Sequence, residues 1–362
     1  MGQNQNPGTN YQLTLSTEKN KGTKGVRQVK KHRKKKLSVE DLTRGVLNGD
    51  KAILARAITL VESTKNEDLK KAYTLVENCL LKKSNSIRIG ITGVPGVGKS
   101  TFIEIFGKTL TSLGKKVAVL AVDPTSTLSK GSILGDKTRM QELVKDPNAF
   151  IRPSPSGESL GGVARKTRES VILCEAAGFD VVLIETVGVG QSETAVHSMV
   201  DFFLLLKLAG AGDELQGIKR GIMEMADAIV INKAEGDNLK KAQLAKVQFE
   251  RALQLYPPKE NGWTPQVSTC SAVENKGIIE IWEMIVQFLN TTKDNGYFAK
   301  NRQKQNKYWL LQAIDELLKQ HFFQTSTVKE HLETMILKVS KDKISPFRAA
   351  EVLMARYRKE LK

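Results

Sequence analysis

The segment Gly93-Val-Pro-Gly-Val-Gly-Lys-Ser100 constrains the fold of this chain more than any other feature. It fits the pattern G-x-x-x-x-G-K-[S/T], in which glycines let backbone amides turn inward around phosphate oxygens. An apolar run precedes it and a helical pattern follows it, which is the strand-to-helix context that gives the motif its meaning. The sequence therefore predicts a phosphate-binding P-loop, reinforced by the positive potential at the N-terminus of the next helix.

The residue types within this motif have separate chemical roles. We expect Lys99 to neutralise the β- and γ-phosphates of a nucleotide and Ser100 to ligate Mg²⁺. An ordinary glycine-rich turn between a strand and a helix is the alternative, but it does not account for the Lys and Ser. The predicted phosphate contacts are Gly93, Val94, Pro95, Gly96, Val97, Gly98, Lys99, Ser100 and Thr101.

Short apolar runs alternate with longer helical patterns from residue 87 onward. This alternation predicts an α/β domain with a mostly parallel sheet covered by helices on both faces. Ligands of such sheets bind at the carboxyl ends of the strands. The predicted strands are 87–91, 117–122, 149–151, 181–184, 202–206, 228–231 and 266–269.

Helical segments flank this domain on both sides. Ser38 with Asp41 resembles a capping box, Asp50 is a candidate cap for a second helix, and 67–82 has the period of a third. A long amphipathic helix is expected over 301–323 and another over 346–361. The predicted organisation is a disordered basic tail at 1–36, a helical domain at 37–83, a nucleotide-binding domain at 84–293 and a C-terminal helical region at 294–362.

The basic tail accounts for most of the net charge of +17, because ten Lys or Arg and no acid lie between Lys19 and Lys36. Such a block of like charges is typical of a solvated, disordered segment. An arm for nucleic acid or another anionic partner is the alternative. No aromatic residue interrupts the run, so base stacking receives no support.

Composition excludes several classes of protein. No apolar run reaches the roughly 18 residues that a membrane span needs, and the N-terminus has no apolar core of a secretory signal. The three cysteines form no C-x-x-C pair and the four histidines are scattered, which argues against disulfides and against a zinc or nickel site. A mitochondrial leader is the alternative at the N-terminus, but Lys outnumbers Arg there and no apolar face is evident, so we expect a cytoplasmic protein.

Two acids at predicted strand ends are candidates for the metal site. Asp123 ends the second strand and Glu185 ends the fourth, and Gly188 follows at the spacing of a loop that senses the γ-phosphate through its amide. Magnesium in nucleotide sites is usually held by one or two carboxylates together with phosphate oxygens. The alternative for each acid is the cap of a neighbouring helix.

The segment Asn232-Lys233-Ala-Glu235 resembles the Asn-Lys-x-Asp motif that reads guanine. The acid of that motif accepts two hydrogen bonds that adenine does not offer, but here Glu stands where Asp is expected. A late strand then leads through Cys270 to Ser271, Ala272 and Val273, the place expected for backbone support of the base. Together these two segments favour GTP over ATP.

At this point the residues resemble a known family. The stretch from Glu185 to Glu193, Glu-Thr-Val-Gly-Val-Gly-Gln-Ser-Glu, is similar to that of metallochaperone-type P-loop GTPases. Within them the chain resembles the methylmalonyl-CoA mutase-associated GTPases, the MeaB/ArgK group, from about residue 46 to 309. The resemblance rests on the segments 55–63, 122–126, 135–140, 152–156, 160–162 and 211–219. Glu235 and the basic tail depart from the pattern.

This resemblance implies a larger site than the motifs do. It implies that Ser100, Asp123, Asp136 and Glu185 ligate magnesium. It also implies that residues 208–219 form a switch loop facing a client protein, with Lys219 reaching the nucleotide when the client stimulates hydrolysis. Catalytic roles are thus expected for Lys99 and Lys219, and Gln191 is the one candidate to orient the attacking water.

The resemblance further implies a homodimer formed through a C-terminal helical arm, although packing of that helix on its own domain is the alternative. Its implied function is to gate adenosylcobalamin loading of methylmalonyl-CoA mutase, or a related acyl-CoA mutase, and to protect or reactivate it. A P-loop kinase, a nickel-insertion chaperone and a nucleic-acid-binding NTPase are the other hypotheses. The nickel hypothesis lacks the clustered His or Cys that it requires.

Overall fold

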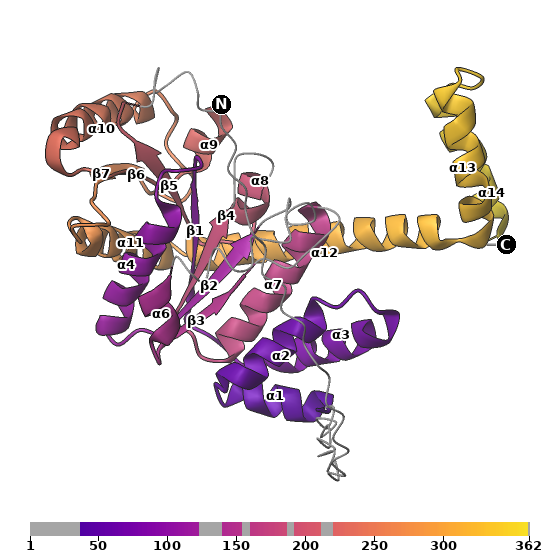
Figure 1. The fold of residues 1–362 in the computed structure, drawn as a ribbon, viewed down its shortest axis with the longest axis horizontal. Coiled ribbons are helices and arrows are strands. Elements are labelled where there is room, and N and C mark those ends of the chain that lie inside the picture. The colour runs from indigo at the N-terminus through magenta and orange to yellow at the C-terminus, as the bar shows by residue number, and fades with distance from the viewer. Residues whose placement is uncertain (1–36, 123–139, 154–159, 187–191, 211–219, 361–362) are drawn as a thin grey trace, which may run out of the picture. The chain divides into compact units, whose positions relative to one another are not determined.

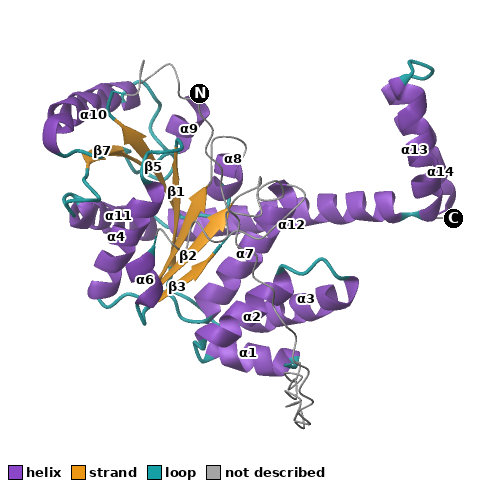
Figure 2. Ribbon diagram, viewed as in Figure 1, coloured by secondary structure: helices purple, strands orange, loops and turns teal. Residues whose placement is uncertain are grey.

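The fold is a seven-stranded sheet between two layers of helices (Figures 1 and 2). A computed structural model describes residues 37–122, 140–153, 160–186, 192–210 and 220–360. The strand order is β3-β2-β4-β1-β5-β6-β7, and all neighbours run parallel. The strands are β1 (Ile87–Gly93), β2 (Val117–Val122), β3 (Ala149–Arg152), β4 (Val181–Thr186), β5 (Phe202–Leu208), β6 (Ala228–Asn232) and β7 (Gln266–Thr269). The predicted fold class and all seven predicted strands are confirmed.

Helices cover the two faces of the sheet in separate groups. One face packs on α4 (Lys99–Ser112), α6 (Gln141–Lys145) and α11 (Ile278–Asp294), through a core that includes Phe102, Phe106 and Phe288. The helices of the other face are α7 (Leu160–Ala176), α8 (Ser192–His197), α9 (Arg220–Met225) and α10 (Leu239–Leu253). Since both faces are covered, strands such as β1 and β4 are buried along their whole length.

The N-terminal helices α1 (Val39–Leu47), α2 (Lys51–Val61) and α3 (Asn66–Leu80) pack on one another and on α7. The predicted starts are confirmed: Ser38 and Asp41 form a capping box at α1, and Asp50 accepts two backbone N–H bonds at the start of α2. The basic tail lies outside the described residues.

Aspartate side chains accept backbone hydrogen bonds at the amino edge of the sheet. Asp180, Asp201 and Asp227 each immediately precede a strand, and each accepts a backbone N–H bond of 2.8–2.9 Å from a neighbouring strand or its leading residue. These contacts satisfy backbone donors that the parallel ladder leaves over at its start. Two of these aspartates, Asp201 and Asp227, are buried, so their carboxylates require cations.

Helix α12 (Tyr297–Gln324) supplies one of these cations and lies along the amino edge. Arg302 donates to both carboxylate oxygens of Asp201 at 2.9 and 2.7 Å and to the Ser86 carbonyl at 2.9 Å. One and two turns further on, Gln305 donates to the Val200 carbonyl and Trp309 to the Ser198 carbonyl. The first half of α12 thus belongs to the core of the domain.

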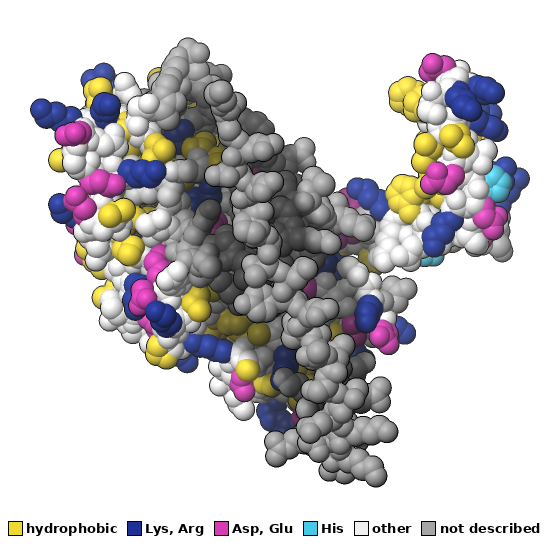
Figure 3. Space-filling model, viewed as in Figure 1, with side chains coloured by type: hydrophobic (Ala, Val, Ile, Leu, Met, Phe, Trp, Pro, Cys, Tyr) yellow, Lys and Arg dark blue, Asp and Glu magenta, His cyan; other side chains and the backbone are white. Residues whose placement is uncertain are grey.

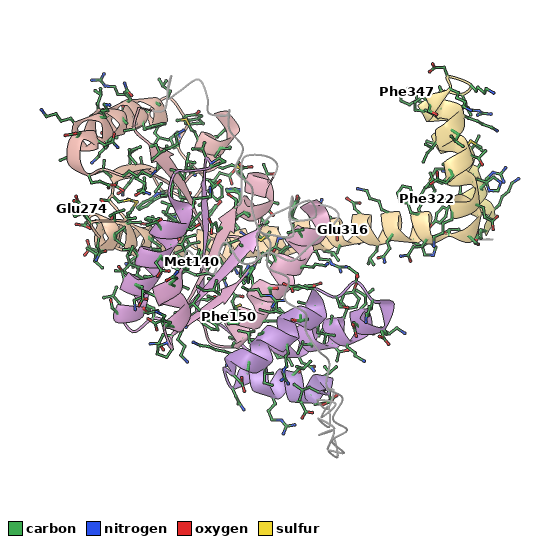
Figure 4. All side chains as sticks on the ribbon, in the orientation of Figure 1. Met140, Phe150, Glu274, Glu316, Phe322 and Phe347 are labelled. Carbon is green, nitrogen blue, oxygen red and sulfur yellow. The ribbon has the colours of Figure 1, made fainter. Side chains whose placement is uncertain are left out.

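The second half of α12 has a different character, because Leu310, Leu311, Ile314, Leu317 and Leu318 are all exposed. It leads into α13 (Ser326–Ser340) and α14 (Pro346–Glu360), which share a small core with Phe322, while Phe347 at the start of α14 is exposed (Figure 4). The predicted helix over 301–323 begins four residues earlier than expected, because Gly296 adopts φ 73° and Asn295 accepts the Tyr297 N–H. Helix α13 was not predicted from the sequence. Among the described residues, no helix is long and apolar enough to cross a bilayer.

We predict that Arg302→Ala lowers the free energy of unfolding by about 3 kcal/mol, because it leaves the buried Asp201 carboxylate without its cation. Urea denaturation measures the change. Arg348→Ala is the matched control, because its ion pair with Glu351 is solvent-exposed and should contribute nothing measurable. Equal effects of the two substitutions would contradict the structural role given to the amino-edge pair.

Candidate functional site

The phosphate loop between β1 and α4 depends on two glycines for its shape. Gly98 has φ 93°, and a Cβ there would lie 2.8 Å from Nδ2 of Asn232. Gly93 has φ 154°, and a Cβ there would lie 2.6 Å from the Leu206 carbonyl oxygen. No other residue fits either position, so the loop's backbone passes close to β5 and β6 while turning into the first residues of α4.

Lys99 is the first residue of α4, and its side chain is buried. The ammonium donates to the carbonyls of Gly93 at 2.7 Å and Val94 at 3.3 Å, which holds it across the loop. Burial lowers the pKa of Lys99, while the charges of Glu185 and Glu193 raise it. A phosphate group in this loop would meet a cation that its surroundings have partly desolvated, which strengthens the attraction.

The two described candidates for metal ligation face each other across the loop. Ser100 Oγ lies 3.5 Å from Oε1 of Glu185, and Glu185 is buried at the end of β4. A hydroxyl and a carboxylate are oxygen ligands of the kind that Mg²⁺ takes beside phosphate oxygens, so these residues fit that ion. The other predicted ligands, Asp123 and Asp136, lie outside the described residues.

Two further residues join this region that the sequence reasoning did not single out. Thr186 donates a 2.9 Å hydrogen bond to the buried Thr92, so the ends of β4 and β1 are tied just before the segment 187–191 and the phosphate loop begin. Glu193, in the first turn of α8, is buried and acts electrostatically on Lys99. Glu193 was predictable, because it ends the recognised stretch that begins at Glu185, whereas the contact between Thr92 and Thr186 arises only because β1 and β4 are neighbours.

The segment after β6 is bound to the phosphate loop by side chains. Asn232 is buried and donates a 2.9 Å hydrogen bond to the Val97 carbonyl. Lys233, in a left-handed conformation with φ 58°, donates to the Gly96 carbonyl at 3.0 Å. Cys270 donates from its thiol to Asn232 Oδ1 at 3.4 Å. The predicted base-reading and phosphate-binding segments are therefore one connected unit.

Glu235 fits the role of an acid that reads guanine. Its Oε2 is buried and has no hydrogen-bond partner among the described residues, which is a costly arrangement for a carboxylate oxygen. Guanine presents two adjacent donors, N1–H and N2–H, that would satisfy such a group. Burial and the charge of Glu235 raise the pKa of Cys270 to about 12, so this thiol remains a donor toward Asn232.

The loop after β7 packs beside this acid. Ser271 and Ala272 are buried, and the Ser271 backbone exchanges two 3.0 Å hydrogen bonds with Lys276. Val273 is exposed. The predicted roles of these three residues remain predictions, as do those of Gln191 and Lys219, which lie outside the described residues.

A hollow of about 500 Å³ lies elsewhere, at the amino edge of the sheet. Its lining includes His197 of α8, Tyr297 of α12, Asp227 before β6 and Lys259 between α10 and β7, together with residues of α9. The phosphate loop follows the carboxyl end of β1 and so lies at the other edge. This hollow is therefore separate from the nucleotide site.

Comparison with known proteins gives the family. The model of the family described as Methylmalonyl Co-A mutase-associated GTPase MeaB matches residues 54–327. The chain belongs to this family. A probable GTPase of Mycobacterium tuberculosis is 48% identical over 88% of this chain and 94% of its own length. The mouse methylmalonic aciduria type A homolog, described as mitochondrial, is 46% identical over 88% of this chain and 80% of its own length.

Two more relatives agree with this assignment. The Escherichia coli GTPase ArgK is 46% identical over 84% of this chain and 92% of its own length. A crystal structure described as LAO/AO transport system kinase has a TM-score of 0.69 and 39% identity, covering 88% of this chain and 97% of that one. With the connected phosphate and base segments, these matches make this member of the MeaB family a P-loop GTPase that binds guanine nucleotides.

We predict that Gly98→Ala weakens GTP binding at least tenfold, because the new Cβ would meet Asn232 Nδ2 and the left-handed φ would be strained. Calorimetric titration with GTP and Mg²⁺ measures the loss. Gly114→Ala shares the positive φ but meets no atom within 4 Å, so it controls for backbone strain alone. Unchanged GTP affinity in the Gly98 variant would refute the predicted approach of the two loops.

We predict that Glu235→Gln reduces the preference for GTP over ATP at least tenfold, because an amide offers one acceptor where guanine needs two. Competition of GTP and ATP for a fluorescent nucleotide measures the preference. Glu274→Gln is the control, since Glu274 lies on the neighbouring loop and pairs with Lys276 (Figure 4). An unchanged ratio of GTP affinity to ATP affinity would show that Glu235 does not recognise the base.

Proposed function

We propose that this GTPase is a chaperone of methylmalonyl-CoA mutase or a related acyl-CoA mutase, gating adenosylcobalamin loading and protecting or reactivating the enzyme. The observation that carries the proposal is the family match over 54–327, a family whose description names association with that mutase. The mouse relative, named for methylmalonic aciduria, points to the same metabolism. In this proposal, the bound nucleotide, GTP or GDP, controls when adenosylcobalamin enters the mutase.

Hydrolysis in this proposal depends on positioning and charge. Lys99 would hold the β- and γ-phosphates, and Ser100, Glu185, Asp123 and Asp136 would hold Mg²⁺, which when bound offsets phosphate charge. Gln191 would orient the attacking water. Basal hydrolysis is then slow, and Lys219 reaches the nucleotide when the mutase binds. Loss of the γ-phosphate would release the segment that follows Glu185.

The proposal includes a homodimer formed through α12. The five exposed aliphatic residues of its second half, Leu310 to Leu318, support this, because a helix face of this kind is normally covered. A cytoplasmic location is also proposed, and three free, buried cysteines suit a reducing compartment.

A kinase is the second candidate function, since the solved relative with 39% identity is named as one. A kinase would transfer phosphate to an acceptor faster than to water.

A nucleic-acid role for residues 1–36 is tested separately, by comparing DNA and RNA binding of the full chain and a chain without that segment at increasing salt.

We predict that purified methylmalonyl-CoA mutase raises the rate of GTP hydrolysis and leaves ATP hydrolysis unchanged. In Lys219→Ala the stimulated rate should fall to the basal rate while the basal rate persists, because Lys219 acts only with the client bound. Phosphate release assays with and without mutase measure both rates. A GTP hydrolysis rate that does not respond to the mutase would refute the chaperone function and leave the GTPase intact.

A further inference from the structure

Helix α10 has a second apolar side that faces away from the sheet. Its inner side buries Ala242, Ala245 and Phe249 against β6 and β7. On its outer side Leu244 is 62% exposed and Val247 is 41% exposed, and these two residues lie about 60° apart around the helix axis. A surface helix normally carries polar residues there, so the exposed Leu244 and Val247 make this side a candidate contact surface.

Cations gather around Leu244 on this outer side. Lys240, Lys241 and Arg251 lie within about 100° of one another around the helix, on the side of Leu244. The helix's one acid, Glu250, is turned away by about 100° from Arg251 and lies 3.8 Å from Lys246. Glu250 also lies about 60° from Val247, so within the described α10 the cations gather around Leu244 and the one carboxylate lies beside Val247.

The position of α10 connects this side to the nucleotide. The helix begins just after the segment that holds Asn232 and Glu235, and the strand after it leads to Cys270. The stem of Lys241 lies against Gly210, which immediately precedes the segment 211–219. In Figure 3, hydrophobic side chains lie among charged side chains of both signs over the α10 part of the domain. A partner protein bound here would contact the helix that connects the Asn232–Glu235 segment to the strand that leads to Cys270.

We propose that the outer side of α10 is the docking surface for the client mutase, through a patch on the mutase that combines acidic and apolar residues. This inference rests on the proposed function. A second copy of this chain does not fit the same place, because a two-fold contact would bring the cations of one copy, such as Lys240 and Arg251, close to the cations of the other copy. The second half of α12 has no such cationic row among its exposed leucines, so the two surfaces take different partners.

Binding through this surface should depend on salt. Cations at the rim of an interface accelerate encounter with an acidic partner, and the aliphatic residues between them supply the contact that excludes water. An anionic membrane could also take a basic, apolar helix side, but no aromatic residue lies among the exposed residues of α10 to enter the lipid interface. The observations therefore favour a protein.

The test compares two double variants of the full chain. Lys240→Glu with Leu244→Ser changes the α10 surface, and Lys70→Glu with Leu81→Ser makes the same chemical changes on and beside α3, where Leu81 is also exposed. Binding to purified methylmalonyl-CoA mutase is measured by biolayer interferometry at 50 and 300 mM NaCl, and GTP affinity by calorimetry. We expect the α10 variant to bind the mutase at least tenfold more weakly and GTP normally, and the α3 variant to match wild type.

Each other outcome overturns the assignment. If wild type and the α10 variant bind the mutase equally, α10 is not the docking surface, and the chaperone function stands. If wild type does not bind the mutase at all, the chaperone function fails together with this surface. If the α10 variant loses binding to phosphatidylserine vesicles while keeping its mutase affinity, the surface belongs to a membrane.

Discussion

The hydrogen bond from the Asn232 side chain to the Val97 carbonyl is the interaction on which the nucleotide site depends. It joins the end of β6 to the turn between β1 and α4, two segments more than 130 residues apart in sequence. Lys233 adds a second bond to the same turn, and the Cys270 thiol fixes the orientation of the Asn232 amide. Recognition of the base and of the phosphates is thereby held in one geometry.

The two edges of the parallel sheet carry different functional groups. Carboxyl ends of the strands provide Glu185, Asn232 and the phosphate loop. Amino ends provide aspartates whose charges are met by Arg302 of α12 and by Lys259. Helix α8 follows the segment after Glu185 in the sequence, and Gln305 and Trp309 of α12 donate to the carbonyls of Val200 and Ser198 just after α8. Helix α12 is thereby tied to the chain that leads from that segment into β5. Among the described residues, exposed aliphatic side chains on α10 and on the second half of α12 are available to partners.

The sequence was sufficient for the fold because burial on both faces makes strands such as β2 and β6 nearly continuous apolar runs, which are easily recognised. The phosphate loop, Glu185 and the Asn232–Glu235 segment were also predictable, since each follows a strand at the ligand edge. Contacts between distant segments were not: the thiol of Cys270 and the hydroxyls of Thr92 and Thr186 gain their roles only from strand neighbours. Helix α13 was missed, because its apolar residues serve a small local core.

Calorimetric titration of the purified full chain with GTP, GDP and ATP, with and without Mg²⁺, tests the central claim most directly. A single connected site for base and phosphates predicts that GTP and GDP bind, that ATP binds far more weakly, and that Mg²⁺ strengthens GTP binding more than GDP binding. Equal affinity for GTP and ATP, or no binding of guanine nucleotides, would contradict it.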